Sequence, residues 1–395
     1  MVRHMVRHHH TVLLAADSFK GSASSSRVED LLEEGVRRVE PDAVVIKYPI
    51  ADGGEGTVDA VIGARGGDIR EIEVAGPLGE PVMARYGLFD DPTAAPGADG
   101  RSAIIEMAAS SGITLIEQSE SHALAASTEG VGQMMLDAVD AGARRIFIGL
   151  GGSATSDGGT GMARALGVRF LDADGEDVPH GLAGLEHLAR IDRSGMDERL
   201  RGVDIVALTD VCNPLTGARG AVHVYGAQKG IPEERMPGLD EWMRRYARLL
   251  AEATGRDSET TPGAGAAGGL GAALVSFCGA TVVSGIDAVL DLIGLDDAMD
   301  AADLVITGEG RMDSQSANGK APVGVARLAK RHGKPVIAVV GSRADDLGGV
   351  YDAGIDLVIP AVTAPATLAA CIARVADSLP LAGESAMRAF LLGGS

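Results

Sequence analysis

The chain is organised around the stretch Leu150-Gly-Gly-Ser-Ala-Thr-Ser-Asp-Gly-Gly-Thr-Gly161. An apolar run at residues 145–148 precedes it and predicts a buried strand, while residues 162–166 predict the start of a helix. A strand, a glycine-rich turn and a helix form the repeating unit of layered α/β proteins. The same arrangement directs backbone N–H groups and a helix N-terminus toward an anion.

Hydroxyl groups and one acid stand among the glycines of this turn. Gly151, Gly152, Ser153 and Thr155 offer backbone and hydroxyl donors, and they predict a phosphate cradle. Asp157 does not suit an anion site, because its carboxylate would repel the phosphate. It indicates instead a metal, a ligand hydroxyl or a proton to be removed. The alternative is a tight turn in which Asp157 caps the helix.

Composition limits the class of protein. The 395 residues, 46% of them hydrophobic, suffice for two domains with sizeable cores. With 35 Lys and Arg against 55 Asp and Glu, the net charge of −20 argues against a nucleic-acid or membrane partner. Three widely spaced cysteines favour a reducing cytoplasm, and no apolar run is long enough to predict a membrane span. Residues 1–10 hold four His without an apolar core, and we interpret them as a leader or tag remnant.

Predicted strands and helices alternate at both ends of the chain, whereas the middle of the chain does not follow this alternation. Within that middle, residues 69–74 and 81–89 read as an antiparallel pair. We therefore expect an α/β protein of two domains. Residues 11–75 and 286–395 are predicted to form a discontinuous Rossmann-like domain with a parallel sheet, and residues 76–285 an inserted mixed α/β domain.

Acidic residues follow several predicted strands, and basic residues are interleaved with them. Each one taken singly is more often a capping or solvated residue. The carboxyl ends of parallel strands, however, meet at the edge of the sheet where ligands bind. Mixed acids and bases at that edge suit phosphoryl transfer. The acids are Asp17, Asp52, Glu55, Asp157, Asp210, Glu309 and Asp313, and the bases are Lys20, Lys229, Arg311 and Lys320.

Several common motifs do not fit. A G-x-G-x-x-G pattern at residues 263–268 follows a polar segment rather than a strand, which argues against a nicotinamide dehydrogenase. We expect this stretch to open an alanine-rich helix. Gly319-Lys320 is followed by Ala321, so the chain has no P-loop. The sequence shows no zinc, thiol or serine-hydrolase motif either.

Six motifs, in one order, identify a family resemblance. They cover most of the chain and are more specific together than any single glycine string. They are Asp17-Ser-Phe-Lys-Gly-Ser22, Pro49-Ile-Ala-Asp-Gly-Gly-Glu-Gly-Thr57, Gly149-Leu-Gly-Gly-Ser-Ala-Thr-Ser-Asp-Gly-Gly159, Gly226-Ala-Gln-Lys-Gly230, Gly263-Ala-Gly-Ala-Ala-Gly-Gly-Leu-Gly271 and Thr307-Gly-Glu-Gly-Arg-Met-Asp313. In these motifs the chain resembles the type 1 glycerate kinase family over residues 11–379.

The resemblance implies an enzyme that phosphorylates D-glycerate with ATP and Mg²⁺. The product expected for this type is 2-phosphoglycerate. It also implies a cytoplasmic protein with small-molecule substrates, as a monomer or homodimer, whose site lies in a cleft between two domains. The phosphate cradle then becomes a nucleotide site, to which we add Lys229.

Roles for the remaining site residues follow from the same resemblance. Residues expected near glycerate are Asp17, Ser18, Lys20, Asp52 and Arg311. Those expected to act in catalysis are Lys20, Asp52, Asp157 and Arg311, with Asp52 favoured as the general base because two glycines beside it leave room for a hydroxyl. Candidate Mg²⁺ ligands are Asp157, Asp210, Glu309 and Asp313.

One departure from the family pattern keeps a second hypothesis open. The family usually has an acid where this chain has Cys212, in Asp210-Val-Cys-Asn-Pro-Leu215. If that acid is a ligand in relatives, its role is lost or moved here. The alternative is a binding module that senses a small hydroxy acid or a nucleotide without turnover.

Overall fold

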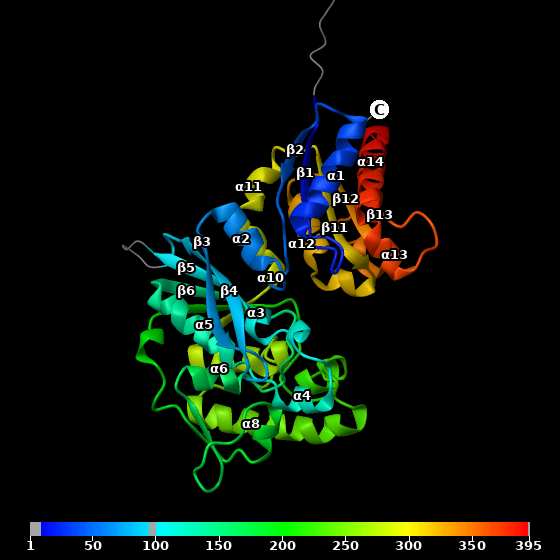
Figure 1. The fold of residues 1–395 in the computed structure, drawn as a ribbon. Coiled ribbons are helices and arrows are strands. Elements are labelled where there is room, and N and C mark those ends of the chain that lie inside the picture. Colours follow the sequence, from blue (N-terminus) through cyan, green and yellow to red (C-terminus); the bar gives the residue numbers. More distant parts are fainter. Residues whose placement is uncertain (1–8, 95–99, 394–395) are drawn as a thin grey trace, which may run out of the picture. The chain divides into compact units, whose positions relative to one another are not determined.

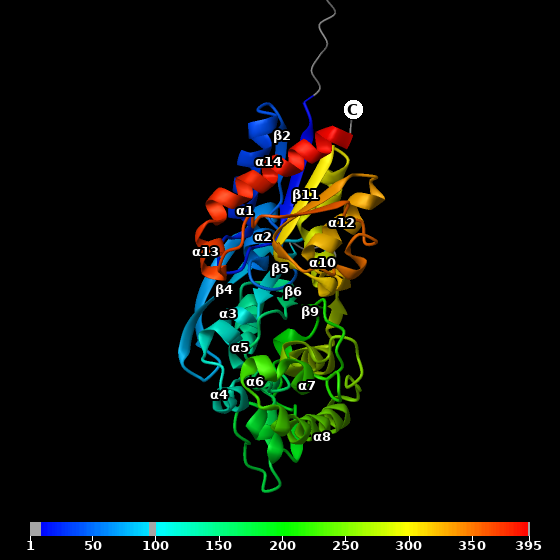
Figure 2. The same cartoon turned by 90° about the vertical axis from the view of Figure 1, so that its right-hand side faces the viewer.

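Two compact units divide the chain in the computed structural model, which describes residues 9–94 and 100–393. Residues 1–52 and 286–395 form the first unit, and residues 53–285 form the second (Figures 1 and 2). The mixed α/β class is confirmed, with a parallel sheet in the first unit and a mixed sheet in the second.

The first unit contains a five-stranded sheet in which every pair is parallel. Its order is β13-β12-β11-β1-β2. β2 therefore lies on one side of β1, and β11, β12 and β13 lie on the other, which is the doubly wound order of flavodoxin-like sheets. The strands are β1 (Thr11–Ala16), β2 (Val44–Lys47), β11 (Leu304–Met312), β12 (Val336–Arg343) and β13 (Leu357–Pro360).

The order of the strands defines a switch point between β1 and β11. Ala16 is the last paired residue of β1, opposite Gly308, and the backbone N–H of Asp17 donates to the Gly308 carbonyl at 2.9 Å. Asp17 and Glu309 therefore emerge side by side at the carboxyl edge of the sheet. Open α/β sheets bind their ligands at such a point.

Helices cover both faces of this sheet. Alternate residues of the strands point to one face, where they form a core with α1 (Ser25–Val39) and α14 (Val375–Gly393). Figure 1 shows these two helices side by side. Their approach is close, since a Cβ on Gly35 would lie 2.2 Å from the Pro380 carbonyl oxygen. The other helices are α10 (Gly285–Ile293), α11 (Leu295–Met299), α12 (Ala321–Arg331) and α13 (Leu368–Ala373), of which α12 packs against β11 and β1.

The second unit contains a six-stranded sheet of order β10-β9-β6-β5-β4-β3. The pairs from β10 to β5 are parallel, and the pairs β5–β4 and β4–β3 are antiparallel. The predicted antiparallel pair is thus confirmed. These strands are β3 (Asp68–Ala75), β4 (Pro81–Asp90), β5 (Arg101–Glu106), β6 (Ala143–Gly149), β9 (Asp204–Leu208) and β10 (Thr281–Val283); β7 (Arg169–Leu171) and β8 (Arg190–Asp192) form a separate hairpin.

The boundary between the units differs from the one expected. Residues 53–75 belong to the second unit, because β3 pairs with β4 along its whole length. The sequence assigned them to the first, since they continue its strand–helix alternation. The return to the first unit at residue 286 falls where the sequence placed it.

Eight α-helices are described in the second unit. Among them, α8 is amphipathic and carries Trp242. Residues 263–271 lead into helix as predicted, since α9 begins at Leu270 and continues as a π-helix to Cys278. Before it, Ala267 and Gly268 adopt left-handed backbone angles, with φ of 51° and 65°. The helices are α2 (Thr57–Arg65), α3 (Ala108–Ser111), α4 (Glu120–Ala125), α5 (Glu129–Asp140), α6 (Thr160–Ala165), α7 (Ala221–Tyr225), α8 (Met236–Thr254) and α9 (Leu270–Ala273).

His10, the last residue of the predicted leader, makes contacts with the folded part of the chain. The backbone N–H of His10 donates to Glu40 Oε1 at 3.0 Å, and its ring Nδ1 lies 2.9 Å from Glu40 Oε2. Residues 1–8 of that leader lie outside the described residues. Across the described ranges, no helix combines the length and the apolar character that a membrane crossing requires.

Candidate active site

A cavity of about 490 Å³ opens at the carboxyl edge of the sheet in the first unit. The segments after β1, β2 and β13 contribute to it, as do the ends of β11 and β12, the N-terminus of α12, the helix α13 and the start of α14. All five residues predicted to lie near the substrate line this cavity. They are Asp17, Ser18, Lys20, Asp52 and Arg311.

Two carboxylates influence each other at the floor of the cavity. Asp17 is half-buried directly after β1, and its Oδ1 accepts a hydrogen bond from the Ser18 N–H at 2.6 Å. Burial and then the negative charge of Asp52 raise the pKa of Asp17 to about 7. A carboxyl group with this pKa can take up or release a proton near neutral pH.

Glu309 presents an oxygen without a partner. Its side chain, on β11, is only 9% exposed, and Oε2 lies 3.6 Å from Nζ of Lys320. Oε1 is buried and finds no hydrogen-bond partner among the residues that the structure describes. Burial raises the pKa of Glu309 above its usual value, although Ser316 and Lys320 oppose the shift. Since buried polar atoms are nearly always satisfied, this oxygen indicates a position where a ligand binds.

Arg311 reaches the cavity from the end of β11. Its side chain is 72% exposed, and its Nε lies 3.9 Å from Asp313 Oδ2. Such a loosely held guanidinium can turn toward an anionic ligand. Asp313 itself is not among the residues that line the cavity.

The glycine-rich turn of the second unit is held by other parts of the protein. The N–H of Gly151 donates to Gly53, that of Ala154 to Ser111 and that of Gly158 to Gly268, at 3.3, 2.9 and 3.0 Å respectively. Thr155 is fully buried, and its hydroxyl donates to the Ala267 carbonyl. Of the predicted phosphate cradle, Gly152 is exposed and Ser153 half-buried. The cradle is therefore less open than the sequence predicts.

Asp157 caps helices rather than facing a cavity. It is fully buried, and Oδ2 accepts from the Thr128 N–H, the Thr128 hydroxyl and the Gly161 N–H at 2.8–2.9 Å. Oδ1 accepts from the Gly159 N–H at 3.0 Å. Four donors occupy this carboxylate, so the expected metal or catalytic role at Asp157 finds no support in its contacts. The capping alternative describes it.

Lys229 is also buried, although the sequence assigned it to the nucleotide site. Its Nζ donates to the Thr155 carbonyl at 2.5 Å. Burial lowers its pKa to about 8, while the charge of Asp157 opposes the shift. This lysine therefore supports the glycine-rich turn from within the core.

The four candidate Mg²⁺ ligands are divided between the units. Asp157 and Asp210 belong to the second unit, where Asp210 Oδ1 accepts from the Ser284 hydroxyl at 2.8 Å. Glu309 and Asp313 belong to the first. In the ranges that the structure describes, no group of three or more His, Cys, Asp or Glu side chains is arranged to hold a metal ion. Of the four, Glu309 lines the cavity.

Comparison with known proteins decides the family. The model of the glycerate kinase family matches residues 12–391. The chain belongs to the glycerate kinase family.

Individual members of the glycerate kinase family are similar over nearly the whole chain. The chain is 45% identical to the glycerate 2-kinase of Escherichia coli (strain K12), covering 90% of this chain and 92% of that one. It is 45% identical to the glycerate kinase of Bacillus subtilis (strain 168), covering 89% and 90%. The crystal structure of a protein assigned as glycerate kinase 2 from Salmonella typhimurium LT2 superposes with a TM-score of 0.82, at 43% identity, over 98% of this chain and all of that one. The prediction of a glycerate kinase from the six motifs is confirmed.

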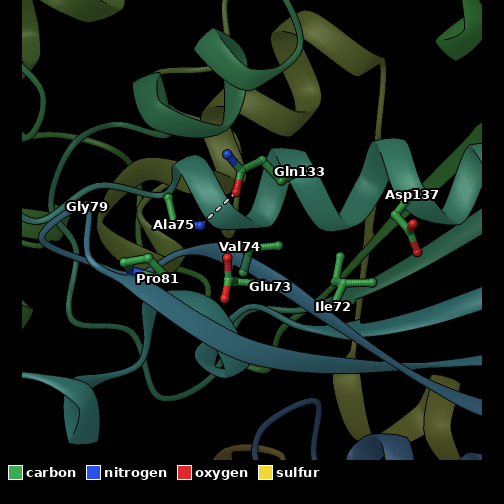
Figure 3. A pocket seen from close by; sticks show the side chains of 8 residues that line it. All are labelled: Ile72, Glu73, Val74, Ala75, Gly79, Pro81, Gln133 and Asp137. Carbon is green, nitrogen blue, oxygen red and sulfur yellow. Dashed lines mark hydrogen bonds between the residues drawn. The ribbon is translucent and has the colours of Figure 1, made fainter.

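A second hollow, in the other unit of this glycerate kinase, lacks comparable chemistry. Figure 3 shows this groove of about 470 Å³ between the edge strand β3 and the helix α5. Gln133 Oε1 accepts from the Ala75 N–H at 2.7 Å, as the dashed line shows. Asp137 accepts from the Tyr86 hydroxyl at 2.6 Å and lies 3.4 Å from Arg70. Among the described residues that line this groove, none is Lys or Arg, so the cavity of the first unit is the candidate active site.

Two further polar residues line the cavity without a role predicted from the sequence. Lys320 is one of the interleaved bases, and Ser342 lies near the carboxyl end of β12 at the same edge of the sheet. Position after a parallel strand is a signal that identifies such residues. The apolar residues that α13 and its neighbours contribute carry no such signal.

Proposed function

We propose that this protein transfers a phosphoryl group from ATP to the 2-hydroxyl of D-glycerate, giving 2-phosphoglycerate and ADP. One observation carries the proposal: the five residues predicted near glycerate, together with Glu309, line one cavity at the switch point of a doubly wound sheet. The 45% identity to a glycerate 2-kinase supports the 2-hydroxyl as acceptor.

Charges around the cavity suit a hydroxy acid and a phosphoryl donor. Lys20, Arg311 and Lys320 supply positive charge for the carboxylate of glycerate and for phosphate oxygens. Phosphoryl transfer depends mainly on such positioning and on electrostatic stabilisation. The protein as a whole is strongly acidic, so this local cluster determines how anions bind.

The proton of the acceptor hydroxyl requires a base. Asp17 and Asp52 lie together in the cavity, and the charge of Asp52 contributes to the raised pKa of Asp17. We assign proton acceptance to this pair rather than to Asp52 alone.

Residues present in the cavity fit a magnesium ion. The buried Oε1 of Glu309 is the hard oxygen ligand that Mg²⁺ prefers, and this ion uses one or two carboxylates together with phosphate oxygens. Glu309 would hold it, and the bound ion would neutralise charge on the transferred group. Lys320 then keeps the other oxygen of Glu309 in place.

The alternative of a binding module without turnover rests on Cys212. This cysteine is exposed in the second unit and does not line the cavity. The presence of a cysteine here, where the family usually has an acid, therefore leaves every charged residue of the cavity in place. A cytoplasmic location and a monomeric or homodimeric state stay predictions from the sequence.

The proposal is tested by incubating the protein with ATP, Mg²⁺ and D-glycerate and identifying the product by ³¹P NMR. We expect 2-phosphoglycerate. A 3-phosphoglycerate signal would overturn the assigned hydroxyl, and ligand-induced stabilisation without any product would favour the binding module. Asp52→Asn is expected to abolish turnover with unchanged thermal stability, and retained activity would remove Asp52 from the catalytic pair.

A further inference from the structure

The cavity of the first unit is lined by two chemically different groups of residues. The charged residues that follow β1 and β2, lie on β11 or precede α12 form one group, which we call the charged floor. The other group consists of aliphatic side chains from the segment after β13, from α13 and from the start of α14. We call this group the apolar wall and define it as Val362, Leu368, Ile372 and Val375.

The residues of the apolar wall are exposed to solvent to different degrees. Leu368 is 77% exposed and Val362 is 36% exposed, while Ile372 and Val375 are half-buried. When a ligand covers an exposed aliphatic group and removes it from water, the free energy of binding becomes more favourable. Aliphatic groups gathered beside a charged floor indicate a ligand with both a charged and an apolar part.

Glycerate cannot use the apolar wall. It has three carbon atoms, each of which carries oxygen, so it offers no apolar surface. A cavity of about 490 Å³ has the size that takes a much larger ligand. The wall therefore serves another molecule that enters the same cavity.

The phosphoryl donor must enter this cavity. Transfer requires the acceptor oxygen and the terminal phosphate to lie within about 3–3.5 Å of each other. When the terminal phosphate of the donor lies next to glycerate at the charged floor, the rest of the donor must extend beyond that floor. The glycine-rich turn of the second unit offers few free amides to bind the phosphates of the donor. The amides of Gly151 and Gly158 already donate to carbonyl groups within the protein.

We propose that the apolar wall binds the purine base of the nucleotide, while its triphosphate extends over Lys20, Arg311 and Lys320. Flat faces of a purine are apolar, and they pack well against branched aliphatic side chains. This inference rests on the proposed function, since it names the subsite for the donor of the same reaction.

A charge placed on the apolar wall tests the proposal. Leu368→Asp changes the most exposed residue of the wall, so folding should tolerate it. Leu381→Asp is the matched control, because Leu381 is 46% exposed on α14 and does not line the cavity. We expect Leu368→Asp to raise the KM for ATP about tenfold and to leave the KM for D-glycerate unchanged, whereas Leu381→Asp changes neither.

A phosphate chain without a base shows whether a variant affects binding at the apolar wall or binding at the charged floor. Inorganic triphosphate should compete with ATP, and its inhibition constant should be the same in Leu368→Asp and in the unchanged protein. If triphosphate weakens as much as ATP, the variant has disturbed the floor and the proposal fails. It also fails if the KM for glycerate alone rises, or if neither KM changes.

Binding without turnover distinguishes this proposal from the proposed function. Isothermal titration with ADP and Mg²⁺, without glycerate, should show about tenfold weaker affinity in Leu368→Asp than in Leu381→Asp. If the protein does not phosphorylate glycerate, the proposed function fails while this comparison still tests the wall. Equal ADP affinities in the two variants would overturn the assignment of the base.

Discussion

Lys320 Nζ lies 3.6 Å from Glu309 Oε2, while Oε1 of the same carboxylate is buried without a partner. A lysine thus holds one oxygen at the edge of the cavity and leaves the other directed at a ligand. Burial of a charged group with one unsatisfied atom costs free energy in the absence of that ligand. The arrangement is that of a site adapted for binding rather than for stability.

Glu309→Gln tests this arrangement. The substitution keeps the shape of the side chain but removes the charge, so we expect kcat to fall roughly 10²-fold and higher Mg²⁺ concentrations to be required. Thermal stability should not decrease, because a buried charge is lost. Steady-state kinetics over a Mg²⁺ titration measure the first effect, and differential scanning calorimetry measures the second.

Asp313→Asn is the matched control for Glu309→Gln. Asp313 follows the same strand but does not line the cavity, so its substitution should leave the Mg²⁺ dependence unchanged. If Asp313→Asn shifts the Mg²⁺ dependence and Glu309→Gln does not, the assignment of Glu309 is wrong.

Activity should depend on the protonation of the Asp17–Asp52 pair. The pKa of Asp17 is raised to about 7, and a base must be deprotonated to accept a proton. We therefore expect kcat/KM to rise with pH through an apparent pKa near 7 and to level off above it. The profile of kcat/KM for D-glycerate between pH 5 and 9 measures this.

Asp52→Asn identifies the origin of that pKa. Removing the negative charge of Asp52 should lower the pKa of Asp17, since this charge is among the causes that raise it. Carbon-13 NMR of labelled aspartate carboxyl groups follows the titration without turnover. An unchanged titration of Asp17 in this variant would show that the two carboxylates do not interact.

Asp157→Asn is expected to destabilise the second unit. Four donors converge on this buried carboxylate, and an amide in its place would direct N–H groups at one or more of them. We expect a loss of about 3 kcal/mol in the free energy of unfolding, measured with urea. Unchanged stability with a lost Mg²⁺ dependence would restore the original prediction of a metal ligand.

The sequence predicted the fold class because local patterns determine it. Apolar runs gave the strands of the parallel sheet, and the polar residues after them gave Asp17, Asp52 and Glu309 at one edge. The edge of the parallel sheet therefore contains the residues that the motifs indicated. Local patterns sufficed here, because each acid is close in sequence to the strand that positions it: Asp17 follows β1 directly, Asp52 lies five residues after β2, and Glu309 lies on β11.

Contacts between distant residues could not be predicted in this way. The glycine-rich turn reads as an open cradle, but Gly158 meets Gly268, 110 positions further along the chain. Asp157 reads as a ligand, but Thr128 from another helix supplies two of its donors. No sequence motif marks the apolar wall, since its proposed function depends on the charged residues that line the same cavity. Pairing between strands placed β3 in the second unit, which no local pattern of that strand reveals.

Glu29 supports the strand that carries Asp17, and its substitution should change how stability depends on pH. It is fully buried on α1, and its Oε1 accepts from the Ala16 N–H at 3.2 Å. Burial raises its pKa from 4.5 to about 9. Folding therefore retains a proton that the unfolded chain loses near pH 4.5. The free energy of unfolding contributed by Glu29 falls as pH rises from about 4.5 to about 9 and is level above that range.

Glu29→Gln removes this dependence but keeps a side-chain oxygen for the Ala16 N–H. We expect the variant to unfold at a higher temperature than the unchanged protein at pH 8, and to show little difference at pH 5. Glu34→Gln, on the exposed side of the same helix, is the matched control and should change neither. Calorimetry follows the unfolding of the whole protein, while the fluorescence of Trp242, the only tryptophan, reports on the second unit. Equal stabilities of Glu29→Gln and the unchanged protein at both pH values would show that Glu29 is ionised in the folded state.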